Sequence, residues 1–104
     1  MTIRAPFQGI RGANQVVTPA AGSAVATLTK DGSSAKSVRF VNSGANICYV
    51  RVGTSVSAAT ATTADTPIRA GSDLIVQKAE GEDTIAHISA TGTTLNIQPG
   101  EGGV

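Results

Sequence analysis

Two side chains in this sequence have the chemistry of a nucleophile and a base, Cys48 and His87. A thiol acts as a nucleophile when an imidazole accepts its proton and a third group orients that imidazole. No acidic residue stands out as the third member, and the two residues fall on separate predicted strands. We therefore expect a small buried cysteine and a structural histidine. The sequence predicts no catalytic residue and a protein that is not an enzyme.

Metal and cofactor sites have as little support. A zinc site needs four ligands, usually Cys or His, and only two such residues exist. The carboxylates of Glu80, Glu82 and Asp83 are possible calcium ligands, but their place between two predicted strands favours a solvated turn. The glycines of residues 100–103 have no lysine and no following helix, so they predict no phosphate-binding loop. We expect no metal and no cofactor.

A sheet that binds nucleic acid carries basic side chains interleaved with aromatic ones. Arg39, Tyr49 and Arg51 form a minimal version of this pattern, but the chain has one tyrosine, no tryptophan and a net charge of only +1. We expect no nucleic-acid partner, and we keep these three residues as candidate contacts in an assembly.

The elements that must position these residues are two runs rich in β-branched and aromatic side chains, 37–41 and 47–52, separated by Asn42-Ser43-Gly44-Ala45-Asn46. This pattern predicts a central hairpin. Because side chains alternate between the faces of a strand, one face holds the predicted core residues Val38, Phe40, Cys48, Val50 and Val52. The other face holds Arg39, Tyr49 and Arg51.

Further short strands with alternating apolar residues are predicted at 16–17, 23–30, 72–78, 84–90 and 93–98, with Pro99-Gly100 ending the last. Glycine-containing turns separate most of them, which is typical of an all-β sandwich. We predict a two-sheet antiparallel, jelly-roll-like sandwich over residues 16–104. The residues expected between the sheets are Phe40, Val50, Val52, Ile88, Leu95 and Ile97. The Ser-, Thr- and Ala-rich stretch 54–64 is read as a flexible surface loop, or else as an irregular edge strand carrying a contact surface.

Residues 1–15 show no helical or strand period and contain Pro6, so we read them as an extended N-terminal arm. Arg4 and Arg11 flank Phe7, an arrangement in which an aromatic anchor supplies affinity and charges select an acidic surface. We expect the arm to hold a neighbouring subunit or a shell.

Composition bounds the cellular setting. The chain has 23 Leu, Ile, Val and Phe residues among 104 and a single cysteine, so its core is thin and no internal disulfide supports it. The N-terminus lacks the apolar segment of a signal peptide, and no apolar run is long enough to span a membrane. We expect synthesis in the cytoplasm, no membrane partner, and help from a homo-oligomer, with a trimer as the expected form.

From Arg39 to Gly102 the sequence resembles a family of small structural proteins of tailed bacteriophages that decorate or cement the capsid. The order and spacing of several motifs carry the resemblance: residues 40–44 (FVNSG), 49–53 (YVRVG), 59–68 (ATATTADTPI), 87–93 (HISATGT) and 99–102 (PGEG).

The resemblance implies a non-enzymatic virion protein that sits on the outer capsid surface, binds the major capsid protein and stabilises the shell. A local three-fold position on the shell would suit the expected trimer. Two alternatives stay open. One is a tail, neck or head-fibre component of the virion; the other, of a different class, is a small nucleic-acid- or carbohydrate-binding β-sandwich.

Overall fold

The computed structural model describes residues 6–29 and 31–103. Within them the chain forms nine strands and no helix, so no helix that could span a membrane is found in this part of the chain. The strands are β1 (Gln8–Gly9), β2 (Gln15–Val17), β3 (Ala24–Thr27), β4 (Ser37–Asn42), β5 (Cys48–Gly53), β6 (Thr66–Ile68), β7 (Asp73–Gln77), β8 (Thr84–Ile88) and β9 (Leu95–Glu101).

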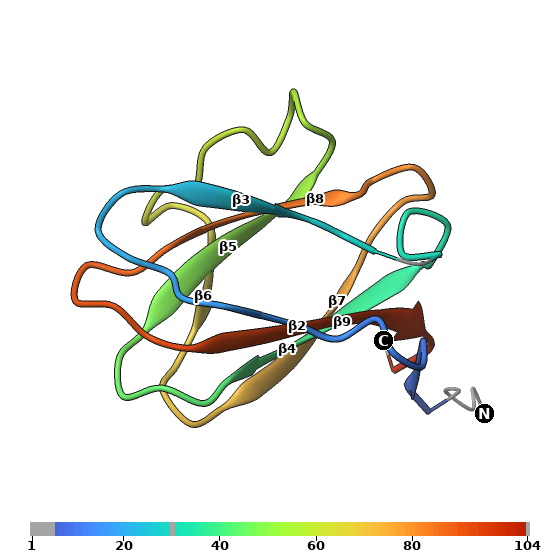
Figure 1. Ribbon diagram of the computed structural model, residues 1–104, viewed down its shortest axis with the longest axis horizontal. Coiled ribbons are helices and arrows are strands. Elements are labelled where there is room, and N and C mark those ends of the chain that lie inside the picture. The colour runs from blue at the N-terminus through green and yellow to red at the C-terminus, as the bar shows by residue number, and fades with distance from the viewer. Residues whose placement is uncertain (1–5, 30, 104) are drawn as a thin grey trace.

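The strands form two antiparallel sheets that face each other, as Figure 1 shows. Sheet A has the order β1-β9-β4-β7, with β2 also paired to β9, and sheet B has the order β3-β8-β5-β6. Because β1 and β2 pair with successive parts of β9, they act as one interrupted edge strand. The result is two four-stranded layers in which the chain changes sheet at nearly every connection. This is the topology of a jelly roll, and the predicted fold class is confirmed.

The core lies between the two sheets and is built from aliphatic side chains around one aromatic ring. Its largest fully buried side chain is Phe40, and it includes Val38, Cys48 and Val50. Leu95 and Ile97 of β9 are also fully buried, and Val52 packs against the cluster while remaining partly exposed. The predicted core faces of both central strands are therefore confirmed.

The predicted central hairpin is wrong, because β4 pairs with β7 and β9 in sheet A while β5 pairs with β6 and β8 in sheet B. The side chain of Asn42, fully buried, explains the crossing. Its amide donates to the carbonyls of Asn46 (2.8 Å) and Ile68 (3.0 Å), and its Oδ1 accepts from Thr93 Oγ1 (2.7 Å). The turn residue thus joins three connections at one end of the sandwich instead of closing a hairpin.

Strand β9 continues through Pro99 and Gly100 to Glu101, so the prediction that these residues end it is wrong. Ser43 N donates to Thr94 O (3.0 Å) in line with the β4–β9 register, and hydrogen bonding alternates along an antiparallel strand. The backbone nitrogen of Pro99, which carries no hydrogen, therefore points away from β4 and toward the interruption between β1 and β2. No ladder bond to β4 is lost there.

Ile88 lies on the outer face of sheet B and not between the sheets, which corrects its place in the predicted core. It packs against a second, smaller cluster formed by Ala58, Ala61 and Ala86. Ala58 and Ala61 belong to the stretch 54–64, where they are 0% and 2% exposed. This stretch is therefore a surface loop, as predicted, and it packs on the outside of sheet B through Ala58 and Ala61.

The described part of the expected N-terminal arm lies along the sandwich. Gln8 and Gly9 pair with Glu101 and Gly100 of β9, and Gln15 pairs with Ile97. This differs from a segment that leaves the domain from residue 1 to residue 15. Residues 1–5, including Arg4, lie outside the described residues.

Candidate interaction surface

The structure separates the three residues predicted to share a basic surface. Arg39 of β4 is on the outer face of sheet A, where its guanidinium bonds the carboxylate of Asp73 in β7 (3.1 Å). Tyr49 and Arg51 of β5 are on the outer face of sheet B. The cause is the crossing between β4 and β5, which places the two strands in opposite layers.

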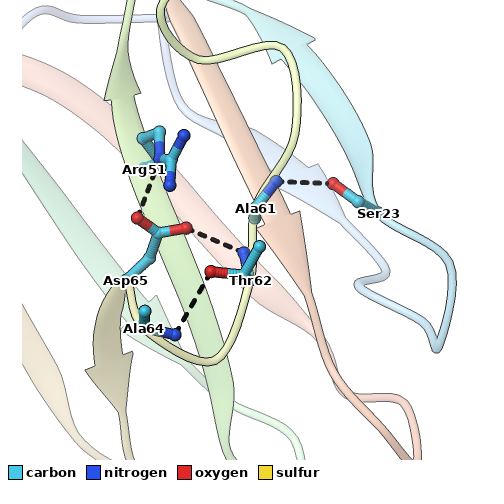
Figure 2. Close-up of polar contacts among 6 residues, drawn as sticks. All are labelled: Ser23, Arg51, Ala61, Thr62, Ala64 and Asp65. Atoms are coloured by element: carbon cyan, nitrogen blue, oxygen red, sulfur yellow. Dashed lines mark hydrogen bonds and ion pairs between the residues drawn. The ribbon is translucent and has the colours of Figure 1, made fainter.

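Arg51 holds the loop of residues 54–65, as Figure 2 shows. Its Nε donates to Asp65 Oδ1 (2.8 Å), and Asp65 Oδ2 accepts from the backbone N–H of Thr62 (2.7 Å). Burial raises the pKa of Asp65, but hydrogen bonds from Arg51 and Thr62 and the charge of Arg51 outweigh it and leave that pKa below the ordinary aspartate value. The carboxylate is therefore ionised at neutral pH and acts as a clamp.

A second tie fastens the same loop to the start of β3. The backbone N–H of Ala61 donates to Ser23 Oγ at 2.8 Å (Figure 2). Ala58 and Ala61 fill the space over Ala86 between these two ties. Small side chains are needed here because the loop lies directly on the sheet, which explains the alanines at positions 58 and 61.

Beside the loop, the outer face of sheet B carries a recess of about 320 Å³ with a mainly apolar lining. Its lining includes Ala21, Ile47, Tyr49, Ile88 and Ala90. Ile47, at 41% exposed, is one of the exposed large aliphatic side chains of the described chain and lines this recess together with Tyr49. A concave apolar site with a tyrosine at its wall suits the insertion of an apolar side chain from a partner.

The sequence pointed to Tyr49 but not to the rest of this recess. Ile47 and Tyr49 alternate along β5 and its approach, and Ile88 pairs with Tyr49 across β5 and β8. Alternation along residues 84–90 places Ile88 on the opposite face of the strand from Ile85 and His87. Once Ile85 is assigned to the core, this pattern predicts that Ile88 lies on the outer face of the sheet. Ala21, far away in sequence, gave no such signal.

A larger cavity of about 420 Å³ lies where β5 and β7 approach each other from opposite sheets. Its lining mixes the apolar Val50, Val52 and Val76 with polar residues that include Asp65 and Glu82. Within residues 6–29 and 31–103, no group of three His, Cys, Asp or Glu side chains is placed to hold a metal ion.

Cys48 and His87 are both buried, and no hydrogen bond joins them in the described structure. Burial raises the pKa of the Cys48 thiol to about 11. Its Sγ lies 3.8 Å from Asn42 Nδ2. Burial lowers the pKa of His87, whose Nδ1 has no hydrogen-bond partner among the described atoms. A protonated thiol and a neutral imidazole are the forms expected at neutral pH.

The acidic segment 80–83 connects β7 of sheet A to β8 of sheet B, and its carboxylates bind within the chain. Glu82 Oε1 accepts from the backbone N–H of Ala79 (2.7 Å), and Asp83 accepts from Thr84 Oγ1 (3.1 Å). The buried Lys78 donates to the carbonyl of Ser33 (3.0 Å). Burial lowers the pKa of Lys78, and the surrounding carboxylates only partly counter this.

Of the arm residues, Phe7 is half-buried and Arg11 is exposed in a turn. Phe7 lies against the C-terminal strand of its own chain: a Cβ on Gly100 would come within 2.7 Å of the ring, and one on Gly103 within 2.9 Å of Phe7 Cβ. The two glycines therefore leave room for the ring. As described, Phe7 packs at the end of sheet A.

No family model and no curated protein matches the sequence. Among solved structures, PirA is similar with a TM-score of 0.56 at 11% identity, over 86% of this chain and 95% of PirA. The protein NMB1881 of Neisseria meningitidis has a TM-score of 0.47 at 15% identity, covering 95% of this chain and 88% of its own. The cupin domain of Schizosaccharomyces pombe Cnp3 has 0.45 at 15%, covering 90% and 59%. At these identities the likeness to PirA shows the fold alone.

Proposed function

We propose that this chain is a non-enzymatic structural protein of a bacteriophage virion, a cement or decoration protein that binds the major capsid protein on the outer head surface. The observation that carries the proposal is the apolar recess beside Tyr49 on the outer face of sheet B, held in shape by the Arg51–Asp65 clamp. A preformed recess on a rigid scaffold lowers the entropy cost of binding a partner.

Two further observations agree with this function. Jelly rolls are used for capsid proteins as well as for lectins and cupins, so the fold is compatible with a virion role without selecting it. The sequence from Arg39 to Gly102 resembles capsid decoration proteins, and its motif residues 59–68 form the second half of the clamped loop, with Asp65, and the whole of β6. The face proposed to bind the shell is thus built partly from the residues that carry the resemblance.

The test is co-sedimentation of the purified chain with phage heads that lack it. Ile47→Asp places a charge in the recess, and Val56→Asp is the matched control, since Val56 is 87% exposed on the same side of the molecule but does not line the recess. Burial of one isoleucine is worth roughly 1.5 to 3 kcal/mol, and 1.4 kcal/mol is about tenfold in affinity. We expect Ile47→Asp to weaken head binding at least tenfold and Val56→Asp to leave it unchanged.

Equal binding by both variants would show that the recess is not the shell contact. Binding to isolated tails in place of heads would replace decoration by a tail or neck role. Binding to an oligosaccharide or a single-stranded nucleic acid, with none to particles, would overturn the virion proposal itself. The expected trimer remains a prediction for the chain on the capsid, and the number of copies seen together in density on particles tests it, separately from the solution dimer proposed below.

A further inference from the structure

One side of the sandwich presents two edge strands, β2 and β3, neither of which carries a charged residue. From Gly12 to Thr29 the sequence contains no charged residue. Two of the exposed large aliphatic side chains lie at the centres of these strands, Val16 (62% exposed) and Val25 (51% exposed). Edge strands in soluble proteins are usually protected by charges, prolines or bulges, because their free backbone groups pair readily with another chain.

The backbone groups of Val25 point away from the protein. Leu28 N donates to Asp83 O (2.7 Å), in line with the β3–β8 register that pairs Ala26 with Ile85 and Ala24 with His87. Because hydrogen-bonded and non-hydrogen-bonded pairs alternate in an antiparallel ladder, Ala24 and Ala26 bond to β8. The N–H and C=O of Val25 and Thr27 therefore face outward. The carbonyl of Thr27 accepts from Gln15 Nε2 (3.0 Å), which agrees with this direction.

Val16 has the same arrangement in sheet A. Ser43 and Thr94 form a hydrogen-bonded pair in line with the β4–β9 register. Because such pairs alternate along β9, the backbone N–H and C=O groups of Leu95 and Ile97 point toward β2. These two residues pair with Val17 and Gln15, so the backbone groups of Val16 face outward. Each layer of the sandwich thus ends on this side in a short strand with an outward-facing central valine.

We propose that a second copy of this chain docks here, by antiparallel pairing of β3 with β3 across a two-fold axis. A two-fold axis through Val25 pairs Val25 with its equivalent and Thr27 with Ser23 of the other copy. The Thr27 carbonyl already accepts from Gln15 Nε2, and its second lone pair is the one left for the N–H of Ser23. If this axis is perpendicular to the sheets, it also brings together the β2 edges of the two copies. Sheet B would then continue through both molecules.

The absence of charge is the reason to choose a second copy over another partner. Across a two-fold axis each residue faces itself or a near neighbour, so any charge near the axis meets a like charge and repels it. A patch meant for a charged partner has no such constraint. Strands this short bury less than the roughly 1,000 Å² of a strong interface, so the dimer should form with rising concentration.

The test uses the purified full chain alone, so its result is independent of the proposed binding to phage heads. Light scattering and analytical ultracentrifugation from about 10 µM to 1 mM should show a monomer–dimer equilibrium. Val25→Lys places two lysines at the axis and should weaken dimerisation at least tenfold. Val56→Lys, with its valine 87% exposed on the loop 54–64, should leave dimerisation unchanged. At low concentration, where the wild type is monomeric, the melting temperatures of both variants should match that of the wild type.

Oxidation of Val25→Cys gives a second measurement. Hydrogen-bonded antiparallel partners have Cα atoms about 5.5 Å apart, within the Cα range of disulfides. Their Cβ atoms are farther apart than in non-hydrogen-bonded pairs, so a small shift of the two strands is needed to close the bond. We expect disulfide-linked dimers to form at least tenfold faster than in Val56→Cys. The native Cys48 should not compete, since it is buried and burial raises its pKa to about 11.

Three results would overturn the proposal. A chain that stays monomeric to 1 mM would do so, as would a trimer as the smallest associated species, because a two-fold edge contact cannot produce it. The third result is a chain that is monomeric in solution and loses its binding to heads in Val25→Lys. The partner of β3 would then be a segment of the shell and not a second copy.

Discussion

The two sides of this sandwich end their sheets in opposite ways. At the β2/β3 side there is no charge from Gly12 to Thr29, and the central valines are exposed. At the β6/β7 side, edge strand β6 contains Pro67 and edge strand β7 begins with Asp73. The two ion pairs of the described chain, Arg51–Asp65 and Arg39–Asp73, also lie on this second side. Proline and charge are the usual means by which an edge is closed to other strands.

The sides also differ in how they are tied to the rest of the molecule. The β6/β7 side is held by the buried Asn42, whose side chain bonds the carbonyl of Ile68 and whose backbone bonds Ser72 and Gly71. The β2/β3 side is tied from Gln15 Nε2 to Thr27 O and from the Ala61 amide to Ser23 Oγ, and the buried Oε1 of Gln15 has no partner among the described atoms. From this difference we infer that the β6/β7 side is built to remain an edge, whereas the β2/β3 side can accept a partner.

The largest effect is expected from the core that both sides share. Phe40 is fully buried and its neighbours in sheet A are Leu74 and Ile97. Phe40→Ala should lower the free energy of unfolding by about 3 to 5 kcal/mol, through lost burial and the cavity left behind. Denaturant unfolding followed by circular dichroism would measure this. An unchanged melting temperature would contradict the register of β4.

Asn42→Ala should come next and should exceed Gln15→Ala on the opposite side. Removal of the Asn42 amide leaves the buried carbonyl of Ile68 and the partly buried groups at Asn46 and Thr93 without this partner. We expect a loss of about 2 to 4 kcal/mol, against about 1 kcal/mol for Gln15→Ala, which breaks a single exposed bond. Chemical denaturation of both variants would test the ranking. Equal losses of unfolding free energy in the two variants would show that the two sides of the sandwich are tied equally firmly.

Mild acid should weaken the protein through His87, which neighbours Ala24 of β3. Burial lowers the pKa of His87 in the folded chain, so below its ordinary value of about 6.5 the unfolded chain binds more protons. Stability should be fully present above about pH 6.5 and should fall as the pH drops from there toward the folded pKa. Melting temperatures between about pH 7.5 and 5 would show this. In His87→Gln the slope should vanish over this window; a slope that persists would assign it to other groups.

The smallest effect is expected at the partly buried Arg51–Asp65 clamp of the β6/β7 side. Asp65→Asn should cost at most about 1 kcal/mol of global stability, because surface ion pairs contribute little. It should nevertheless release the loop, seen as faster hydrogen exchange at the Thr62 amide. The folded pKa of Asp65 is lowered, so acid should have the same effect only below about pH 3.9. Asp73→Asn is the control, since its ion pair with Arg39 ties down no loop; faster Thr62 exchange in that variant as well would contradict the clamp.

The sequence predicted the all-β sandwich, the inward faces of its two central strands and the burial of Leu95 and Ile97. These are local properties: alternation along a strand decides which side chains share a face, and glycine-rich turns divide the chain into strands. Arg51 and Tyr49 could likewise be placed on an outward face from alternation alone. Their assignment to the same surface as Arg39 failed.

Only the tertiary structure decided which strands pair and which outward residues meet. Asn42-Ser43-Gly44 is turn chemistry in a hairpin and in a crossing between sheets alike, because the dihedral angles favoured by a turn do not specify the partner strand. The choice is made by contacts far apart in sequence, such as Asn42 with Ile68 and Thr93. The recess at Tyr49 and the free edge at Val25 follow from that pairing, since each is assembled from strands that are neighbours in space and not in the chain.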